Sequence, residues 1–227
     1  MATIYAHTND GYVARFNQSS WVDARDGASG TTSSSTGARH YTGITGEKVA
    51  ARGGGYAFNV FRSFFFFDTS GISTNVNNAL LKVYGYNQGG GDLIAVKATS
   101  DIGTITTADF DSIVGWNNSS ADGSGAGDME SAVTKYSPEI STWSTSGYNN
   151  ILLNAQALAD MRDDDNVYIC LLNFDYDLKD VAPTGYSSNR NGMWYTDYTG
   201  TSRDPYVDYT LAAVTAADNA IFFGTNF

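Results

Sequence analysis

Few side chains in this sequence have the spacing that catalysis requires. The two histidines, His7 and His40, do not lie in a metal-ligand pattern, and the chain contains no Gly-x-Ser-x-Gly turn, phosphate-binding loop or zinc motif. Nucleophilic and acid–base catalysis need partner groups within hydrogen-bond reach of one another. We therefore expect a protein that is not an enzyme and has no catalytic residues.

Two groups of aspartates are the best candidates for a metal site. One group lies at 160–165, and the other consists of Asp175, Asp177 and Asp180. Carboxylates can hold calcium, and a pair of them can hydrolyse a glycosidic bond. Neither group matches the EF-hand pattern, and aspartate is a common turn residue. We expect solvated turns rather than a calcium site, no other cofactor, and catalysis as the weakest alternative.

The tryptophans could supply a surface for stacking against sugars. Trp116 and Trp194 have polar neighbours, and together with Tyr195 they are the candidates for glycan binding, whereas Trp143 fits a core position. Aromatic side chains are also common anchors of cores and interfaces. Both interpretations of these aromatic residues therefore stay open.

The elements that must position these side chains are mainly β-strands. Four phenylalanines occupy 64–67, at the end of a strand predicted over 56–68. Successive strand residues point to opposite faces, so both faces of this strand must be covered. The candidates for the second cover are a polar tract at 24–46, a helix at 154–161 and a neighbouring subunit.

The remaining pattern predicts an all-β fold. The tract at 24–46 and the stretch at 117–127 are expected to be loops, Thr106 to cap a helical turn, and Asn154 to cap the helix. Other strands are predicted at 11–16, 77–87, 92–98, 133–140, 150–153, 167–174 and 206–211. Short strands with Gly/Ser turns indicate a jelly-roll β-sandwich of two antiparallel sheets with one or two short helices. We expect one domain covering 1–211.

The segment 212–227, after the last predicted strand, is unusually apolar for a terminus. It contains Ile221, Phe222, Phe223 and Phe227. Free termini are usually polar and fray, so an apolar tail is expected to dock. Docking on the chain's own domain and docking on a neighbouring subunit are equally consistent with the sequence.

Composition narrows the classes of partner. The net charge is −11, from 24 acidic and 13 scattered basic residues, whereas a nucleic-acid surface needs a positive stripe. No apolar stretch has membrane-spanning length, and the first residues do not form a signal peptide. The single cysteine, Cys170, lies in an apolar run and is expected to be a buried, inert thiol. We expect a soluble chain made in the cytoplasm that binds neither nucleic acid nor the membrane interior.

Three stretches resemble the DNRLRE-type jelly-roll modules. They are the Asp-Gly-Tyr-Val sequence at 10–13, the Arg-Ser start and Asp-x-Ser-Gly-Ile turn around the phenylalanines at 62–72, and the strand at 79–84. Such modules occur as carbohydrate-binding or spacer domains of surface proteins. The resemblance implies a jelly-roll fold and the alternative function of a carbohydrate-binding module.

The whole chain is similar to virion proteins of tailed bacteriophages. The stretches that carry this similarity are 1–6, 141–149, 194–205 and 218–224. The resemblance implies a structural protein on the particle surface, assembled in the host cytoplasm as a capsid decoration, head fibre or tail component. It further implies other virion proteins as partners, a homo-oligomer with a trimer favoured, and contact with a host-surface polysaccharide as an option. A polysaccharide-degrading enzyme is the third alternative.

Overall fold

The computed structural model describes residues 1–48, 55–99, 103–117 and 127–213. Within these ranges the chain is all-β, with eleven antiparallel strands and a few short helices, which confirms the predicted class. None of the described helices has the length and apolar character needed to cross a bilayer. The predicted docking residues Ile221, Phe222, Phe223 and Phe227, and most of the loop at 117–127, lie outside the described residues.

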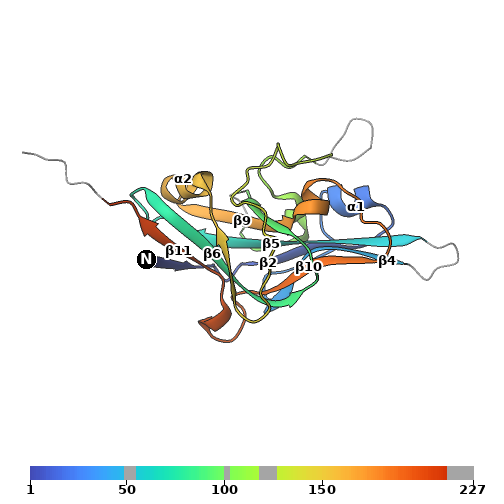
Figure 1. Cartoon of the computed structure of the whole chain (residues 1–227), viewed down its shortest axis with the longest axis horizontal. Helices are drawn as coiled ribbons and strands as arrows, with labels where there is room; N and C mark the ends of the chain where they lie inside the picture. Colours follow the sequence, from blue (N-terminus) through green and yellow to red (C-terminus); the bar gives the residue numbers. More distant parts are fainter. Residues whose placement is uncertain (49–54, 100–102, 118–126, 214–227) are drawn as a thin grey trace, which may run out of the picture.

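The elements are named in the order in which they follow one another along the chain. The strands are β1 (Ala2–Tyr5), β2 (Gly11–Gln18), β3 (Thr32–Ser34), β4 (Arg39–Lys48), β5 (Tyr56–Asp68), β6 (Val76–Gln88), β7 (Leu93–Lys97), β8 (Tyr148–Leu152), β9 (Asn166–Asn173), β10 (Ser187–Trp194) and β11 (Tyr206–Leu211). The α-helices are α1 (Trp21–Asp26) and α2 (Ala155–Asp163), and the helical turns are η1 (Thr107–Asp111), η2 (Phe174–Leu178) and η3 (Thr201–Arg203). The two α-helices lie at opposite ends of the molecule (Figure 1).

The strands form two sheets that share β6. The β6 sheet has the order β1-β11-β6-β8. In the β5 sheet, β2 pairs with one side of β5, and β4 and then β9 pair with the other side, with β10 beyond β4 and β7 beyond β9. The last residues of β6 pair with β10, so the hydrogen-bonded ladder passes from one sheet into the other. The architecture is β-sandwich-like, and the jelly-roll order stays a prediction.

Strand β5 separates two apolar cores. Phe65 and Phe67 lie in a first core between the two sheets, and Phe64 and Phe66 lie in a second core on the other face of β5. Residues from α1 and from 105–133 complete the second core. The prediction that both faces of the phenylalanine strand are covered is confirmed. The helix at 154–161 was one of the expected covers of the second face. This expectation is wrong, because α2 packs on the first core.

Several predicted elements match, and others do not. Strands β5 and β11 have the predicted bounds, and α2 is capped by Asn154, whose side chain accepts a hydrogen bond from the Ala157 amide. The tract at 24–46 is not one long loop, because it contains β3 and most of β4. The strand predicted at 133–140 is also wrong, because this segment forms isolated bridges to β7 at Lys135 and Ile140 and no continuous ladder.

Candidate functional site

Each of the three aspartates considered for calcium faces a cation, and Asp177 and Asp180 share Arg25. Asp177 is fully buried and accepts hydrogen bonds from Arg62, at 2.9 Å from Nε and 2.7 Å from Nη2. Asp180 lies 3.5 Å from Nη1 of Arg25. Asp175 lies 3.5 Å from Nζ of Lys179. Among the described residues no group of three or more potential ligands converges on a metal position. The aspartates that the sequence allowed as calcium ligands are therefore used in ion pairs with Arg25, Arg62 and Lys179.

Trp116 packs beside the buried ion pair instead of projecting from the surface. The guanidinium carbons of Arg62 and Arg25 lie 4.0 Å and 4.8 Å from its ring centroid. The half-buried ring also contacts the second core. Stacked arginine and tryptophan side chains stabilise one another through cation–π attraction. Trp116 therefore helps to cover two buried arginines, a role that the polar sequence around it did not indicate.

Tyr195 is wrong as a glycan-binding residue. Its side chain is fully buried in the first core, and its hydroxyl shares a 2.6 Å hydrogen bond with the Ser63 hydroxyl. Trp194, one position earlier, points to the opposite face, because neighbouring residues at a strand end alternate in direction. Burial raises the pKa of Tyr195 well above that of a free tyrosine. The two neighbours predicted to act together thus lie on different sides of β10.

Trp194 is also buried, with only 9% of the residue exposed, and it lies beneath a surface on which rings and arginines alternate. Its ring centroid lies 4.6 Å from that of Tyr198 and 5.8 Å from that of Tyr86. The guanidinium carbons of Arg203 and Arg39 lie 4.4 Å and 4.9 Å from the indole centroid. We call this surface, which also includes a neighbouring pair on β4 and β10, the aromatic–arginine face: Arg39, Tyr41, Tyr86, Arg190, Trp194, Tyr198 and Arg203.

The aromatic–arginine face is built from strands that are distant in sequence. Strand β10 pairs with β4 on one side and with the end of β6 on the other, which places their outward side chains next to one another. The loop from β10 to β11, at the lower edge of the molecule in Figure 1, adds Tyr198 and Arg203. A Cβ atom at Gly192 would lie 2.7 Å from the Tyr86 ring. This glycine therefore lets the tyrosine lie flat across β10.

A row of tyrosines continues the face across the β6 sheet. Ring centroids are 5.2 Å apart for Tyr84 and Tyr148, 4.9 Å for Tyr148 and Tyr206, and 5.6 Å for Tyr206 and Tyr5. The Arg203 guanidinium carbon, 5.3 Å from the Tyr84 ring, joins the row to the face. Aromatic rings thus cross the outside of both sheets without interruption. Sequence analysis had singled out Trp194 alone from this set.

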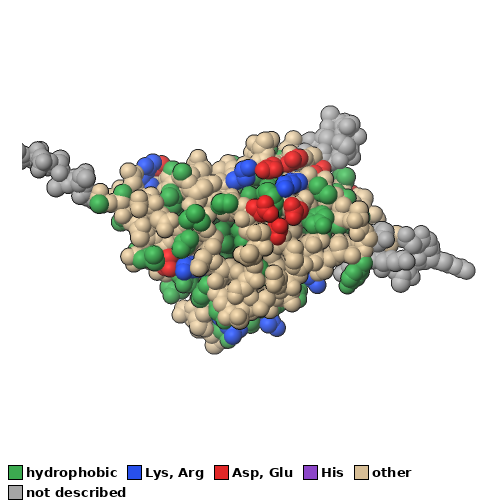
Figure 2. All heavy atoms as spheres, viewed as in Figure 1, with side chains coloured by type: hydrophobic (Ala, Val, Ile, Leu, Met, Phe, Trp, Pro, Cys, Tyr) green, Lys and Arg blue, Asp and Glu red, His purple; other side chains and the backbone are tan. Residues whose placement is uncertain are grey.

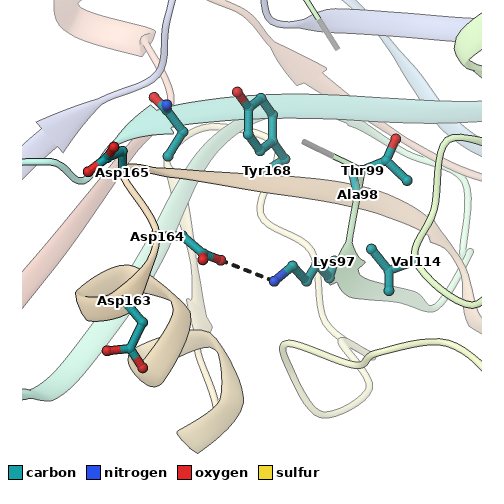
Figure 3. Close-up of a pocket in the computed structure, with 9 residues that line it drawn as sticks. Lys97, Ala98, Thr99, Val114, Asp163, Asp164, Asp165 and Tyr168 are labelled. Carbon is teal, nitrogen blue, oxygen red and sulfur yellow. Dashed lines mark hydrogen bonds and ion pairs between the residues drawn. The ribbon is translucent and has the colours of Figure 1, made fainter. Parts of the chain in front are cut away.

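A hollow on another part of the described surface has a different character. Lys97 lies at its centre, 3.0 Å from Oδ2 of Asp160 and 3.1 Å from Oδ2 of Asp164, and Figure 3 shows the Lys97 side chain reaching toward Asp164. The hollow measures about 590 Å³. Burial disfavours the charged lysine, but the two carboxylates outweigh it and raise its pKa. Lys97 therefore stays a cation in an ion-pair network and is not a poised base or nucleophile.

The other titratable groups that chemistry could use are held in packing contacts. Burial and the nearby Arg190 lower the pKa of His40, whose ring stacks on Tyr12 with centroids 3.5 Å apart. Burial raises the pKa of the Cys170 thiol. Burial also raises the pKa of Asp10 to about 7, although Thr196 donates hydrogen bonds to this carboxylate. Asp10 has no solvent exposure, so it cannot touch a substrate in this structure.

Comparison with known proteins adds no name. A scan against protein-family models finds no match for the chain, and neither does a search of the curated proteins. The likeness to virion proteins and to DNRLRE-type modules therefore stays a prediction from the sequence.

Proposed function

We propose that this protein is a structural component of a bacteriophage particle, exposed on its surface as a capsid decoration, head fibre or tail component. It acts there by contact and not by catalysis, and other virion proteins and further copies of the same chain are its partners. The sequence similarity described above supports the virion assignment. The structural support is the aromatic–arginine face together with the tyrosine row.

The position of these rings is the observation that carries the proposal. Tyr41, Tyr84 and Tyr86 are partly exposed on the outside of the sheets, although the fold has two apolar cores that could hold them. Tyrosine and arginine are enriched at contact surfaces, because they combine a large apolar area with hydrogen-bonding groups. A sheet that is packed on both sides of β5 holds such a surface rigid. Rigid rings lose little side-chain freedom when a partner binds.

The surface composition is also suited to contact. Figure 2 shows that most of this view of the molecule is polar but uncharged. Arg25, Arg62 and Asp177, which the fold buries completely, lie in internal ion pairs. A surface of hydroxyl and amide groups presents hydrogen bonds at little desolvation cost compared with charges. Such a surface fits assembly and recognition better than acid–base chemistry.

Mass spectrometry of purified phage particles tests the virion assignment. We expect peptides from this chain in density-purified particles, at a copy number that matches a symmetric position of the particle. Antibody labelling of intact particles should then locate the chain on the outside. If the chain is abundant in infected cells and missing from the particles, the proposal is wrong.

A carbohydrate-binding module of a surface protein is the second candidate. The observation that favours it is the pair of partly exposed rings Tyr86 and Tyr198, which pack on the buried Trp194. Planar side chains at a surface can stack on the apolar faces of sugar rings. A glycan array separates the candidates, using Tyr86→Ala and Tyr198→Ala beside Tyr186→Ala. Tyr186 is highly exposed but belongs to neither ring group, so it is the matched control. Binding by a monomer that is absent from particles would favour the module.

A further inference from the structure

Three arginines of the aromatic–arginine face have no carboxylate partner in the described part of the chain. Arg39, Arg190 and Arg203 take part in none of its ion pairs. The chain carries 24 acidic and 13 basic residues, so an arginine has many carboxylates available. Arg25 and Arg62 do find such partners. Three unpaired guanidinium groups on one face leave positive charge that an external anion can neutralise.

Each of these guanidinium groups lies over an aromatic ring. The guanidinium carbon of Arg190 lies 4.1 Å from the Tyr41 centroid, that of Arg39 lies 4.8 Å from Tyr86, and that of Arg203 lies 4.6 Å from Tyr198. A guanidinium group stacked on a ring keeps its N–H edge free, and that edge matches the two oxygens of a carboxylate. Because stacking has already restricted the side chain, binding an anion costs less conformational entropy.

We propose that the aromatic–arginine face binds an acidic polysaccharide, whose carboxylate groups pair with Arg39, Arg190 and Arg203 while its sugar rings pack on the intervening aromatic side chains. This inference rests on the proposed role as a surface-contact protein and names the ligand class of that contact. The guanidinium groups recognise the charge, and Tyr41, Tyr86 and Tyr198 offer apolar surface and hydroxyl groups to the sugars.

The width of the face favours a chain of sugars over a single small anion. Its members come from β4, β6, β10 and the loop after β10, so several positions along a polymer can be contacted at once. Several weak contacts made by one polymer add through effective concentration. The tyrosine row of Tyr84, Tyr148 and Tyr206 extends the same surface and offers room for further sugars.

Charge density distinguishes this ligand from a nucleic acid. Duplex DNA carries about one negative charge per 1.7 Å of its axis, and the protein has a net charge of −11. Asp197 and Asp204 lie in the same loop as Arg203, so a densely charged strand would meet them as well. A polysaccharide with carboxylates on separated sugars can place its charges at the arginines and its neutral parts elsewhere.

Binding to uronic-acid polymers tests the proposal. The probes are polygalacturonate, alginate and hyaluronan, each compared with a neutral form, such as fully methyl-esterified polygalacturonate, and with single-stranded poly(dT). Affinity is measured by calorimetry with the full chain at two salt concentrations. We expect at least one acidic polymer to bind, its neutral form to bind at least tenfold more weakly, and binding to weaken as salt rises.

Variants locate the contact. Arg190→Gln and Arg203→Gln should each weaken binding by about tenfold, as expected when a hydrogen bond to a charged group is lost. Arg203→Lys should restore only part of the affinity, because lysine lacks the planar fork. Arg162→Gln, on α2 and paired with Asp163, is the matched control and should bind like the unaltered chain. Circular dichroism and thermal unfolding confirm that each variant is folded.

Four results would overturn the inference. They are no binding to any acidic polymer, equal binding to the neutral form, tighter binding to poly(dT), and arginine variants that bind like the Arg162→Gln control. The outcome is separate from the virion test. If the chain is found in particles but does not bind acidic polymers, the proposed function is supported and the proposed ligand is wrong. If the chain binds acidic polymers but is absent from particles, the ligand is supported and the virion assignment is wrong.

Discussion

Arg62 and Asp177 form an ion pair from which solvent is excluded on both sides. Arg62 also donates a 2.7 Å hydrogen bond to the Phe110 carbonyl and a 3.1 Å hydrogen bond to the Arg25 carbonyl. Removing one partner of such a pair leaves an uncompensated buried charge, which costs about 3–5 kcal/mol. We therefore expect Arg62→Met to lower the free energy of unfolding by about that amount, measured by urea denaturation.

The double variant Arg62→Met/Asp177→Leu is the control for this prediction. It removes both charges of the pair, so it lacks the Asp177 carboxylate that Arg62→Met leaves buried without its closest cation. We expect the double variant to be more stable than Arg62→Met alone, because replacing both partners by apolar groups avoids the buried charge. Equal or lower stability of the double variant would show that the hydrogen bonds to the backbone carbonyls matter more than the charge.

Asp10 makes stability depend on pH in the direction opposite to that of most carboxylates. Its pKa is about 7 in the folded chain, against 3.8 for a free aspartate, because burial outweighs the hydrogen bonds from Thr196. Between these values the folded protein holds a proton that the unfolded chain has released. The contribution of Asp10 to the free energy of unfolding therefore falls as pH rises from about 4 to 7.

Asp10→Asn isolates this contribution. The amide keeps an acceptor for Thr196 but cannot ionise. We expect the free energy of unfolding of the variant, relative to that of the unaltered chain, to rise from pH 5 to pH 8. Urea unfolding at each pH measures it. Asp197 and Asp204 also have raised pKa values, but both proteins share them, so the difference reports on Asp10. A constant difference across this range would contradict the prediction.

At the scale of single residues, only part of the candidate site could be predicted from the sequence. Polar neighbours pointed to Trp194 and Tyr195 as exposed residues, but both are buried, Tyr195 completely. The direction of a side chain at a strand end depends on register, which the sequence around 194 does not fix, because β10 is mostly polar. The three unpaired arginines were missed for a related reason. Their lack of partners is a property of packed neighbours and not of spacing along the chain.

At the scale of elements, β5 is the strand on which both cores depend. Phe64 and Phe65 point to opposite faces, and neither has any solvent exposure. Replacing a buried phenylalanine by alanine costs about 3–5 kcal/mol through lost burial and the cavity left behind. We expect Phe64→Ala and Phe65→Ala to destabilise the protein by similar amounts in denaturant titrations. Leu152→Ala, at a half-exposed position of β8, should change stability by less than about 1 kcal/mol.

Strands rich in apolar residues could be predicted from sequence, and polar strands could not. The bounds of β5 and β11 match because apolar and aromatic residues dominate both. Strands β4 and β10 consist mainly of Thr, Gly, Ser, Asn and charged residues, which are also typical of loops. Their pairing with each other and with β5 and β6 stabilises them in the folded chain. Long-range pairing of this kind leaves little trace in local composition.

At the scale of the whole molecule, β5 joins the two cores into one unit, because it contributes side chains to both. Trp143 lies in the first core, and Trp21 lies in the second. Phe64 and Phe65 are neighbours in β5 and belong to different cores. If one core unfolds, β5 is no longer held in place, and the other core loses the strand on which it packs. We expect a single cooperative unfolding transition. Fluorescence of variants that keep only Trp143 or only Trp21 should give coincident curves, whereas two separate midpoints would show independently unfolding cores.

The proposed assembly leads to a prediction for the complete chain. Strand β1 is an edge of the β6 sheet beside β11, so the N-terminus lies next to the last described strand (Figure 1). If oligomerisation uses the apolar residues Ile221, Phe222, Phe223 and Phe227, deletion of 216–227 should convert a trimer into a folded monomer. Light scattering measures the mass, and circular dichroism checks the fold. A trimer that survives the deletion would place the contact elsewhere, and a full-length monomer would contradict the trimer itself.

The buried thiol of Cys170 gives the chain a practical property. It is the only cysteine, it has no solvent exposure between β5 and β7, and burial raises its pKa, so the folded protein should resist thiol-reactive reagents. A cysteine introduced at an exposed position such as Ser188 would then be the sole reactive point. One surface could be tethered to a sensor or a fluorophore in a known orientation, without first removing the natural residue.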